Sequence, residues 1–389
     1  MIAFRRFRLI AALGLVVAGP AFALDYQVHG FAAQGYLLSE GNNFFGDSTN
    51  GSHDYYEAAI NGSINLGHGL LASAQGLIRD AGRTDSGKPR LDYALLDWNV
   101  IQRAESTAGV RLGRVKNPLG LFNDTRDVIF ARPSILLPQS IYFDGAGLRG
   151  IFFSSDGAQL YAGRAFGLHD WSMTLSTALD RDFTRNEREL LLGDGAGPEE
   201  IRLEGLVFSQ LTDSWNGDRV RLSLSHAHAK VTVDPSPTFP IDAEVNVNVY
   251  VASARYNAER YSLTGEYIYT RSRTHLDTVP SASASDGGYI QFDYRPAEHW
   301  SMFARYDVNF VDADDRNGNR AAAELGVDRY SRFARDLTLG VGWHPDSHWG
   351  VWGELHSIYG TSTAPALDNP DGADDPHWFL FTVMAGYRF

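Results

Sequence analysis

The chain has 389 residues, with 34 Lys plus Arg against 47 Asp plus Glu, and it contains no cysteine. The formal net charge of −13 argues against a nucleic-acid-binding protein and against a protein that binds membranes through a basic surface. The lack of cysteine excludes disulfides and cysteine-ligated metal. The 39 Gly and the 48 aromatic residues (22 Phe, 18 Tyr and 8 Trp) fit a β-protein with many tight turns, which includes barrels, large sandwiches and propellers.

The N-terminus has the pattern of a secretory signal peptide. Three arginines precede an apolar run from Leu9 to Val17, and Ala21 and Ala23 provide small residues for cleavage. The run is too short to cross about 30 Å of hydrocarbon as a helix, so a membrane anchor is the less favoured alternative. We expect a signal peptide at residues 1–23 and a single mature domain at 24–389. Cleavage would lower Lys plus Arg from 34 to 31 against 47 Asp plus Glu, a net charge of −16.

Runs of alternating apolar and polar residues, separated by turn residues, follow one another along the mature chain. Short connections such as Gly67-His68-Gly69 alternate with long ones, as in successive antiparallel hairpins. We count about sixteen strands, and an even number places both termini at the same end of the sheet. The predicted strands are Gln27–Leu37, Tyr55–Leu66, Leu70–Arg79, Leu91–Gln102, Thr107–Val115, Gly147–Ser155, Ala158–Phe166, Ile201–Leu211, Arg219–Val233, Glu244–Tyr256, Tyr261–Arg273, Gly288–Tyr294, Trp300–Phe310, Phe333–His344, Trp349–Tyr359 and His377–Phe389.

Alternation gives these strands one apolar and one polar face. The apolar positions of four clear examples are Val220, Leu222, Leu224, Val245, Val247, Val249, Val251, Met302, Tyr306, Val308, Phe310, Leu337, Leu339, Val341 and Trp343. About sixteen apolar faces exceed what one soluble core can use, whereas a bilayer can accept them all. The sequence therefore predicts an all-β fold, a transmembrane antiparallel β-barrel with the apolar faces toward lipid. The polar faces would line a lumen, and among them we place Arg219, Arg221, Arg305, Asp307 and Asp336.

The last predicted strand, HWFLFTVMAGYRF, alternates strictly and ends in Tyr-x-Phe at Phe389. This ending resembles the C-terminal signal of Gram-negative outer-membrane β-barrels, and the chain as a whole resembles the sixteen-stranded trimeric porins. The resemblance implies an outer-membrane location with lipid and lipopolysaccharide as surroundings, periplasmic short turns and extracellular long loops. It also implies a homotrimer that passes small hydrophilic solutes or ions, with no enzyme activity, cofactor or nucleic-acid partner.

One long connection, Lys116 to Ala146, is more apolar than an exposed loop should be. By its position after the fifth strand it resembles the third outer loop of the general porins, which folds into the lumen and narrows it. The resemblance makes eight residues candidates for the constriction, four on the loop and four on the wall. They are Asp124, Arg126, Asp127 and Arg132 on the loop, and Arg111, Arg114, Arg149 and Arg164 on the wall. Two interpretations stay open: the charges face each other across the pore and set a transverse field, or they pair to hold the loop.

The stretch Arg111 to Gly120 also resembles the strand-to-loop junction of phosphate-selective porins, although the match is short and the chain is acidic overall. A channel selective for anions, phosphate-like solutes or carboxylates is therefore one alternative function. A plugged barrel that acts as an adhesin or enzyme is another.

Other segments carry weaker signals. Asp180 to Leu192 predicts a short amphipathic helix that could plug the lumen, cap it or bridge subunits. Val311 to Leu325 is rich in Asp and Asn, but its spacing does not fit a calcium-binding loop, and we expect a solvated loop. His226 and His228 share a strand face without an evident third ligand. No nucleophile elbow, zinc-protease motif or phosphate loop occurs, so we predict no catalytic and no metal-binding residues.

Overall fold

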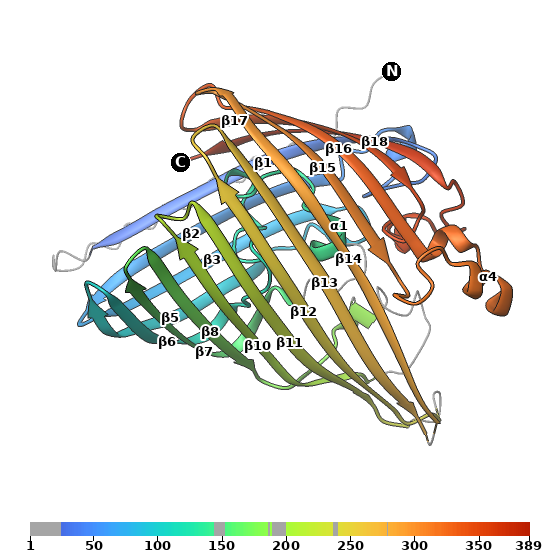
Figure 1. Cartoon of the computed structure of the whole chain (residues 1–389), viewed down its shortest axis with the longest axis horizontal. Helices are drawn as coiled ribbons and strands as arrows, with labels where there is room; N and C mark the ends of the chain where they lie inside the picture. Colours follow the sequence, from blue (N-terminus) through green and yellow to red (C-terminus); the bar gives the residue numbers. More distant parts are fainter. Residues whose placement is uncertain (1–24, 144–151, 186, 189–199, 236–239, 278) are drawn as a thin grey trace.

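A computed structural model describes residues 25–143, 152–185, 187–188, 200–235, 240–277 and 279–389. The expected signal peptide and Arg149 lie outside these residues. Within them, sixteen long strands form one antiparallel sheet in which the strands pair in chain order, and the first strand pairs with the last, from Phe31 opposite Arg388 to Glu40 opposite Phe379. The sheet is thereby closed into a barrel (Figure 1). The prediction of an antiparallel barrel of about sixteen strands is confirmed.

The strands are β1 (Tyr26–Glu40), β2 (Tyr55–Gly67), β3 (Leu70–Ala81), β5 (Arg90–Arg103), β6 (Ser106–Lys116), β7 (Ser154–Phe166), β8 (His169–Ala178), β10 (Arg202–Trp215), β11 (Val220–Val233), β12 (Ala243–Asn257), β13 (Tyr261–Leu276), β14 (Val279–Ala297), β15 (Trp300–Phe310), β16 (Phe333–Trp343), β17 (Trp349–Tyr359) and β18 (His377–Arg388). Two short strands, β4 (Asp85–Ser86) and β9 (Arg181–Asp182), pair with β3 and β10. The helices are η1 (Ser48–Asn50), η2 (Ile129–Ala131), α1 (Gln139–Tyr142), α4 (Asn319–Leu325), η3 (Arg329–Arg332) and η4 (Ala366–Asp368). None of the described helices has the length and apolar character needed to cross a bilayer.

The connections between strands differ in length at the two ends of the barrel. At one end tight turns such as Asn216–Arg219 join the strands, and Gly30 of the first strand bonds there to the C-terminal Phe389 through backbone hydrogen bonds of 3.2 and 3.0 Å. At the other end most connections are long, except that β13 runs almost directly into β14. The sequence interpretation placed a loop between Arg273 and Gly288, but both strands continue through this segment and pair from Leu276 opposite Val279.

The outer surface of the barrel is an apolar belt. On β18, Phe379 and Phe381 are 49% and 43% exposed, whereas the intervening Leu380 is 1% exposed and packs inside. Leu222 and Leu224 on β11 point outward in the same way. Trp300 stacks on Trp343 beside the short turns, with their ring centroids 6.1 Å apart. An apolar belt with aromatic residues at its edge is the surface that a lipid bilayer stabilises, because exposing so much apolar surface to water would cost a large free energy.

On β12 the prediction of which face meets lipid is wrong. Val249 and Val251 are 5% and 1% exposed and pack inside the barrel, while Tyr250 between them is 48% exposed on the outside. The outward neighbours toward the long-loop end are Asn246 and Asn248, and the Asn248 amide oxygen contacts both His226 and His228 rings on β11, at 3.3 and 3.2 Å. Alternation separates two faces but does not say which one points inward.

Candidate functional site

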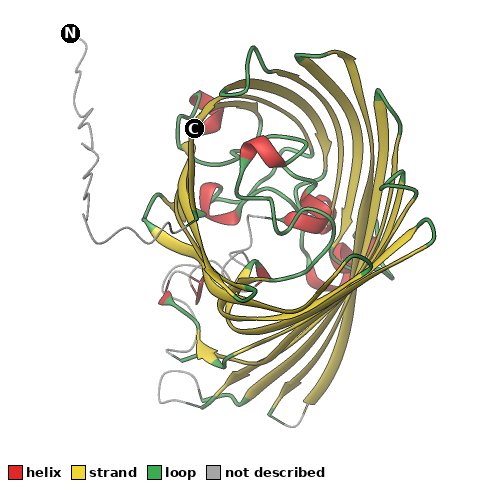
Figure 2. Cartoon of the chain, turned by 90° about the vertical axis from the view of Figure 1, so that its left-hand side faces the viewer, coloured by secondary structure: helices red, strands yellow, loops and turns green. Residues whose placement is uncertain are grey.

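A connection of 37 residues, 117–153, follows β6, and its described part from Asn117 to Phe143 crosses the inside of the barrel. It contains η2 and α1, and Figure 2 shows helices and loops filling part of the ring of strands. Hydrogen bonds tie this segment, which we call the inner loop, to strands on opposite sides of the barrel. Three glutamates of the wall, Glu57, Glu266 and Glu354, each bind the inner loop.

Glu57 on β2 binds the middle of the inner loop. Its carboxylate accepts from Arg132 at 2.9 Å and from Arg79 of β3 at 3.3 Å, and all three side chains are buried. The Tyr55 hydroxyl of the same strand donates to the backbone oxygen of Ile135 at 3.2 Å. Although burial opposes a charge on Arg132, the Glu57 carboxylate raises the pKa of Arg132 above its ordinary value. Arg132 therefore stays charged, and the pair holds the loop against the wall.

The next part of the inner loop is bound by β15 and β17. The Glu354 carboxylate accepts from the backbone N–H groups of Ile135 and Leu136, the second at 3.2 Å. On β15, Arg305 donates to the Ser134 hydroxyl at 3.1 Å, and Asp307 accepts from the Ser140 backbone N–H at 3.3 Å. These charged wall residues are buried, so each bond counts for more than it would in water.

The far wall is reached through Glu266 on β13. Its two oxygens accept from the Leu121 backbone at 2.8 Å, the Tyr142 hydroxyl at 2.7 Å, the Tyr289 hydroxyl at 2.8 Å and the Ser253 hydroxyl at 2.7 Å. Burial and the neighbouring Glu266 raise the pKa of Tyr142 well above its usual range, so its hydroxyl keeps the proton that it donates.

The loop residues singled out in the sequence do not all face the lumen. Arg126 is 2% exposed and donates to the Tyr142 carbonyl at 2.7 Å, and Arg132 is bound to Glu57 as described. Asp127 accepts from Lys116 at 2.5 Å. Only Asp124, among these four, is exposed, and it lies within electrostatic reach of Lys116 and Arg111.

The described wall residues singled out in the sequence lie on the neighbouring strands β6 and β7. Arg111 on β6 donates to Asp97 at 2.9 Å and to Gln159 at 2.7 Å, with about a third of its side chain exposed. Arg114 pairs with Asp156 of β7 at 3.3 Å. Arg164 is exposed and opposite Ser106 at the short-turn end of β7, so its placement beside the loop is wrong.

The predicted lumen-lining residues fall into two groups. Arg305, Asp307 and Asp336 point inward and are buried beneath the inner loop, where Asp336 contacts the His356 ring at 2.8 Å. Arg219 and Arg221 lie beside the short turn at Asn216, bound to the Tyr256 hydroxyl and to Asp218.

Between the inner loop and the short turns, the inward side chains are polar and partly exposed. Asn61, Asp97, Tyr161, Arg221 and Arg255 are examples from five different strands. Polar side chains that keep exposed surface inside a closed barrel indicate a lumen that holds water.

Sequence reasoning missed the residues that anchor the loop. Glu57, Glu266 and Glu354 each stand on the inward face of a strand that has few other acidic residues, which is the signal that was available. A buried carboxylate requires several donors, and here the donors come from the loop.

The described residues contain no group of three side chains suited to hold a metal ion. In the Asp-rich segment after β15, Asp312 accepts from Arg320 at 2.6 Å and Asp315 accepts from the Ala321 backbone at 2.9 Å. Of the segment Asp180 to Leu192, in which the sequence predicts a helix, residues 186 and 189–192 lie outside the described part. Arg181–Asp182 forms the strand β9 instead of helix, and Glu187 pairs with Arg181 at 2.6 Å.

No protein-family model and no curated protein matches the chain in sequence. Solved structures of outer-membrane porins and channels match its fold. The outer-membrane channel DcaP of Acinetobacter baumannii aligns with a TM-score of 0.61 and 12% identity over 94% of this chain and 97% of that chain. OmpF of Salmonella typhi aligns with a TM-score of 0.58 and 11% identity over 94% of this chain and 97% of that chain. An anion-selective porin from Comamonas acidovorans aligns with a TM-score of 0.52 and 13% identity over 94% of this chain and 99% of that chain. The chain therefore has the fold of the outer-membrane porins.

Proposed function

We propose that the protein is an outer-membrane porin, a water-filled channel for passive diffusion of small hydrophilic solutes or ions. The observation that supports this most directly is the inner loop, which crosses a closed barrel with an apolar outside and leaves a polar, partly exposed lumen toward the short turns. The porin fold agrees with this proposal. The protein would be exported through a signal peptide cleaved after Ala23, lie among lipid and lipopolysaccharide, form a homotrimer and carry no enzyme activity.

The charged part of the constriction would be the gap between Asp124 on the inner loop and Arg111 on β6. Asp124 is exposed, and Arg111 keeps about a third of its side chain exposed although Asp97 and Gln159 bind it. Opposite charges across a narrow water path orient dipolar solutes and bias ion flow. Arg126, Asp127 and Arg132 would instead hold the loop in place, because each is buried with partners of its own.

Planar-bilayer recording with the purified, reconstituted protein tests the proposal. We expect stepwise, ohmic conductance in salt solution. A correctly folded barrel that carries no current would reject the porin function and favour a plugged barrel with activity in its loops.

The constriction has its own test in the same recordings. Arg111→Glu should shift the reversal potential in a salt gradient toward cation selectivity, because it removes the positive side of the gap. Arg164→Glu, the same charge change at the short-turn end, is the matched control and should shift it much less. Equal shifts from the two variants would place the selective point elsewhere.

Export and assembly are measured separately. Intact-mass analysis of the membrane-inserted protein should give a chain that begins at Leu24, and native mass spectrometry should show three copies. A full-length mass would contradict the signal peptide, and a monomer would contradict the trimer.

A further inference from the structure

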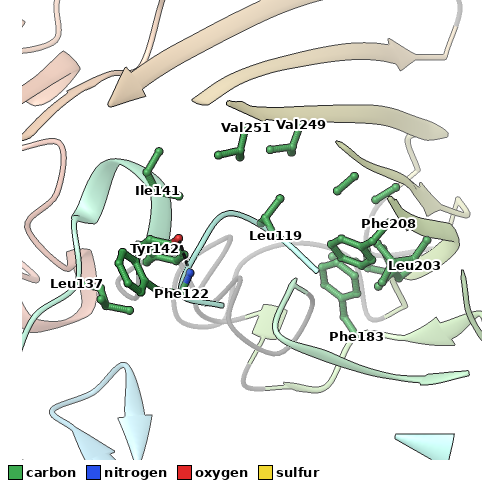
Figure 3. Packing of buried hydrophobic residues seen from close by; sticks show 14 of the residues in the cluster. Leu119, Phe122, Leu137, Ile141, Tyr142, Phe183, Leu203, Phe208, Val249 and Val251 are labelled. Carbon is green, nitrogen blue, oxygen red and sulfur yellow. Dashed lines mark hydrogen bonds between the residues drawn. The ribbon is translucent and has the colours of Figure 1, made fainter. Parts of the chain in front are cut away.

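An apolar cavity of about 630 Å³ lies inside the barrel, between the inner loop and the inward faces of β10 to β13. The wall side is formed by valines of β11 and β12, among them Val231, Val245 and Val247, which keep part of their surface uncovered. In Figure 3, Leu119 and Ile141 of the loop lie across from Val249 and Val251 of β12. Cavities of this size, about 300–1,000 Å³, commonly hold small ligands.

The cavity has almost no means to bind an ion. None of the described residues that line it is an Asp, Glu, Lys, Arg or His. An ion that entered would lose water without gaining a partner of opposite charge, which is strongly unfavourable. The opposite wall, under Glu57 and Glu354, is rich in buried charge, so the absence of charge is a local property of the cavity lining.

One end of the cavity is polar and uncharged. Gln139 and Ser140 of α1, Asn309 of β15 and Ser272 and Ser285 lie at its edge. The amide nitrogen of Gln139 donates to the Leu137 carbonyl at 2.6 Å, whereas its amide oxygen has no hydrogen-bond partner among the described residues. That oxygen is covered, but Ser272 and Ser285 are half-buried, and their hydroxyls can exchange hydrogen bonds with a hydroxyl of a bound molecule.

On the premise that the protein is the channel proposed above, we infer that this cavity binds uncharged solutes that combine an aromatic or compact apolar group with hydroxyls. The apolar group lies on the valines of β11 and β12, and a hydroxyl forms a hydrogen bond with Ser272 or Ser285. Its position inside the barrel admits only molecules small enough to enter the lumen, which excludes a protein partner or a membrane surface. The solute class differs from the ions that the charged gap at Asp124 and Arg111 selects.

Calorimetric titration of the protein in lipid nanodiscs, without detergent, tests the inference with three related probes. Phenyl β-D-glucoside carries both an aromatic ring and hydroxyls, and should bind at least roughly tenfold more tightly than methyl β-D-glucoside, which lacks the ring. Phenyl β-D-glucuronide has the same ring with a carboxylate and should bind no better than the methyl glucoside. Equal affinity for all three probes, or tighter binding of the glucuronide, would overturn the inference.

A pair of variants on β12 locates the site. Val247→Asp places a charge in the cavity wall and should abolish the preference for the phenyl glucoside, whereas Asn246→Asp places it one residue away on the outer face and should leave the preference unchanged. Val245→Thr keeps the side-chain shape but adds a hydroxyl to the cavity wall, and it should weaken the preference for the phenyl glucoside. This variant still tests the site if Val247→Asp does not fold. Retained preference in both cavity variants would contradict the site.

Bilayer recording separates this inference from the porin function. In conducting channels, phenyl glucoside should interrupt the current at lower concentration than methyl glucoside. If no channel conducts but calorimetry shows the phenyl preference, the porin function fails and the cavity site stands. If channels conduct and the two glucosides bind alike, the channel stands and the inferred site fails.

Discussion

The two sides of the lumen hold the inner loop in different ways. On β2, β15 and β17, buried charged side chains bind the loop directly. Glu57 binds Arg132, Arg305 donates to the Ser134 hydroxyl, and Glu354 accepts from two backbone N–H groups. On β10 to β13 the inward face around the cavity is apolar, Glu266 is the charged anchor, and the cavity separates this part of the wall from the loop. The inward residues of the alternating strands therefore have two roles. On one side of the lumen they position the inner loop, and on the other they line the apolar cavity.

Removing the charged contact on the first side should have the largest effect. Glu57→Ala leaves two buried arginines, Arg79 and Arg132, without this carboxylate, and should lower the free energy of unfolding by about 3–5 kcal/mol. Urea titration in lipid vesicles measures this change. Arg114→Ala, which breaks the more exposed pair with Asp156, is the control and should cost about 1 kcal/mol or less. Equal losses in both variants would mean that the buried pair does not dominate.

The anchor on the second side should have an intermediate effect. Glu266→Gln replaces an acceptor of four hydrogen bonds by an amide that presents N–H groups to the same donors, at a cost of about 1–3 kcal/mol. The loop should then loosen, and trypsin should cleave it faster after Arg126; the bond after Arg132 resists trypsin because Pro133 follows it. Glu244→Gln, at a partly exposed outward position of β12, should leave the cleavage rate unchanged. An unchanged rate in Glu266→Gln would show that the charged side alone holds the loop.

The smallest change tests the orientation of β12. Because the chain has no cysteine, Val247→Cys and Asn246→Cys each introduce a single thiol. Both should change the free energy of unfolding by only about 0.5 kcal/mol. In membranes, a bulky polyethylene-glycol maleimide should label Asn246→Cys, whereas Val247→Cys should react only with a small maleimide that enters the lumen. The reverse labelling pattern would mean that the valines of β12 face lipid, as the sequence predicts.

The sequence was sufficient for the fold class but not for every strand. The count of sixteen was right because two errors cancelled. Asp156-Gly157 has turn chemistry, but Gly157 lies within β7, where a Cβ would come within 2.0 Å of the Thr177 carbonyl oxygen, so this glycine permits close approach of β8. The hairpin predicted at Asp156-Gly157 is therefore wrong. The second error is β8, which alternates and exposes Trp171 and Met173 but falls in the gap between the predicted strands that end at Phe166 and begin at Ile201.

The site was less predictable than the fold. Alternation identifies which residues share a face, but the position of a residue along the barrel and the partners it meets depend on pairing between distant strands. Arg164 and Arg111 look alike in sequence, yet Arg111 lies opposite Gln159 in the middle of the β6–β7 ladder and Arg164 lies opposite Ser106 at its short-turn end. The contact between Glu57 and Arg132 joins residues 75 positions apart and has no local signal.

The inner loop also has a mechanical consequence. Because it is bonded at β2, β13, β15 and β17, it works as a strut across a hollow cylinder. Lateral compression by the surrounding lipid, or tension from a neighbouring copy, would be transmitted through it to the opposite wall. A barrel braced in this manner resists becoming oval, and its cross-section stays fixed while solutes pass.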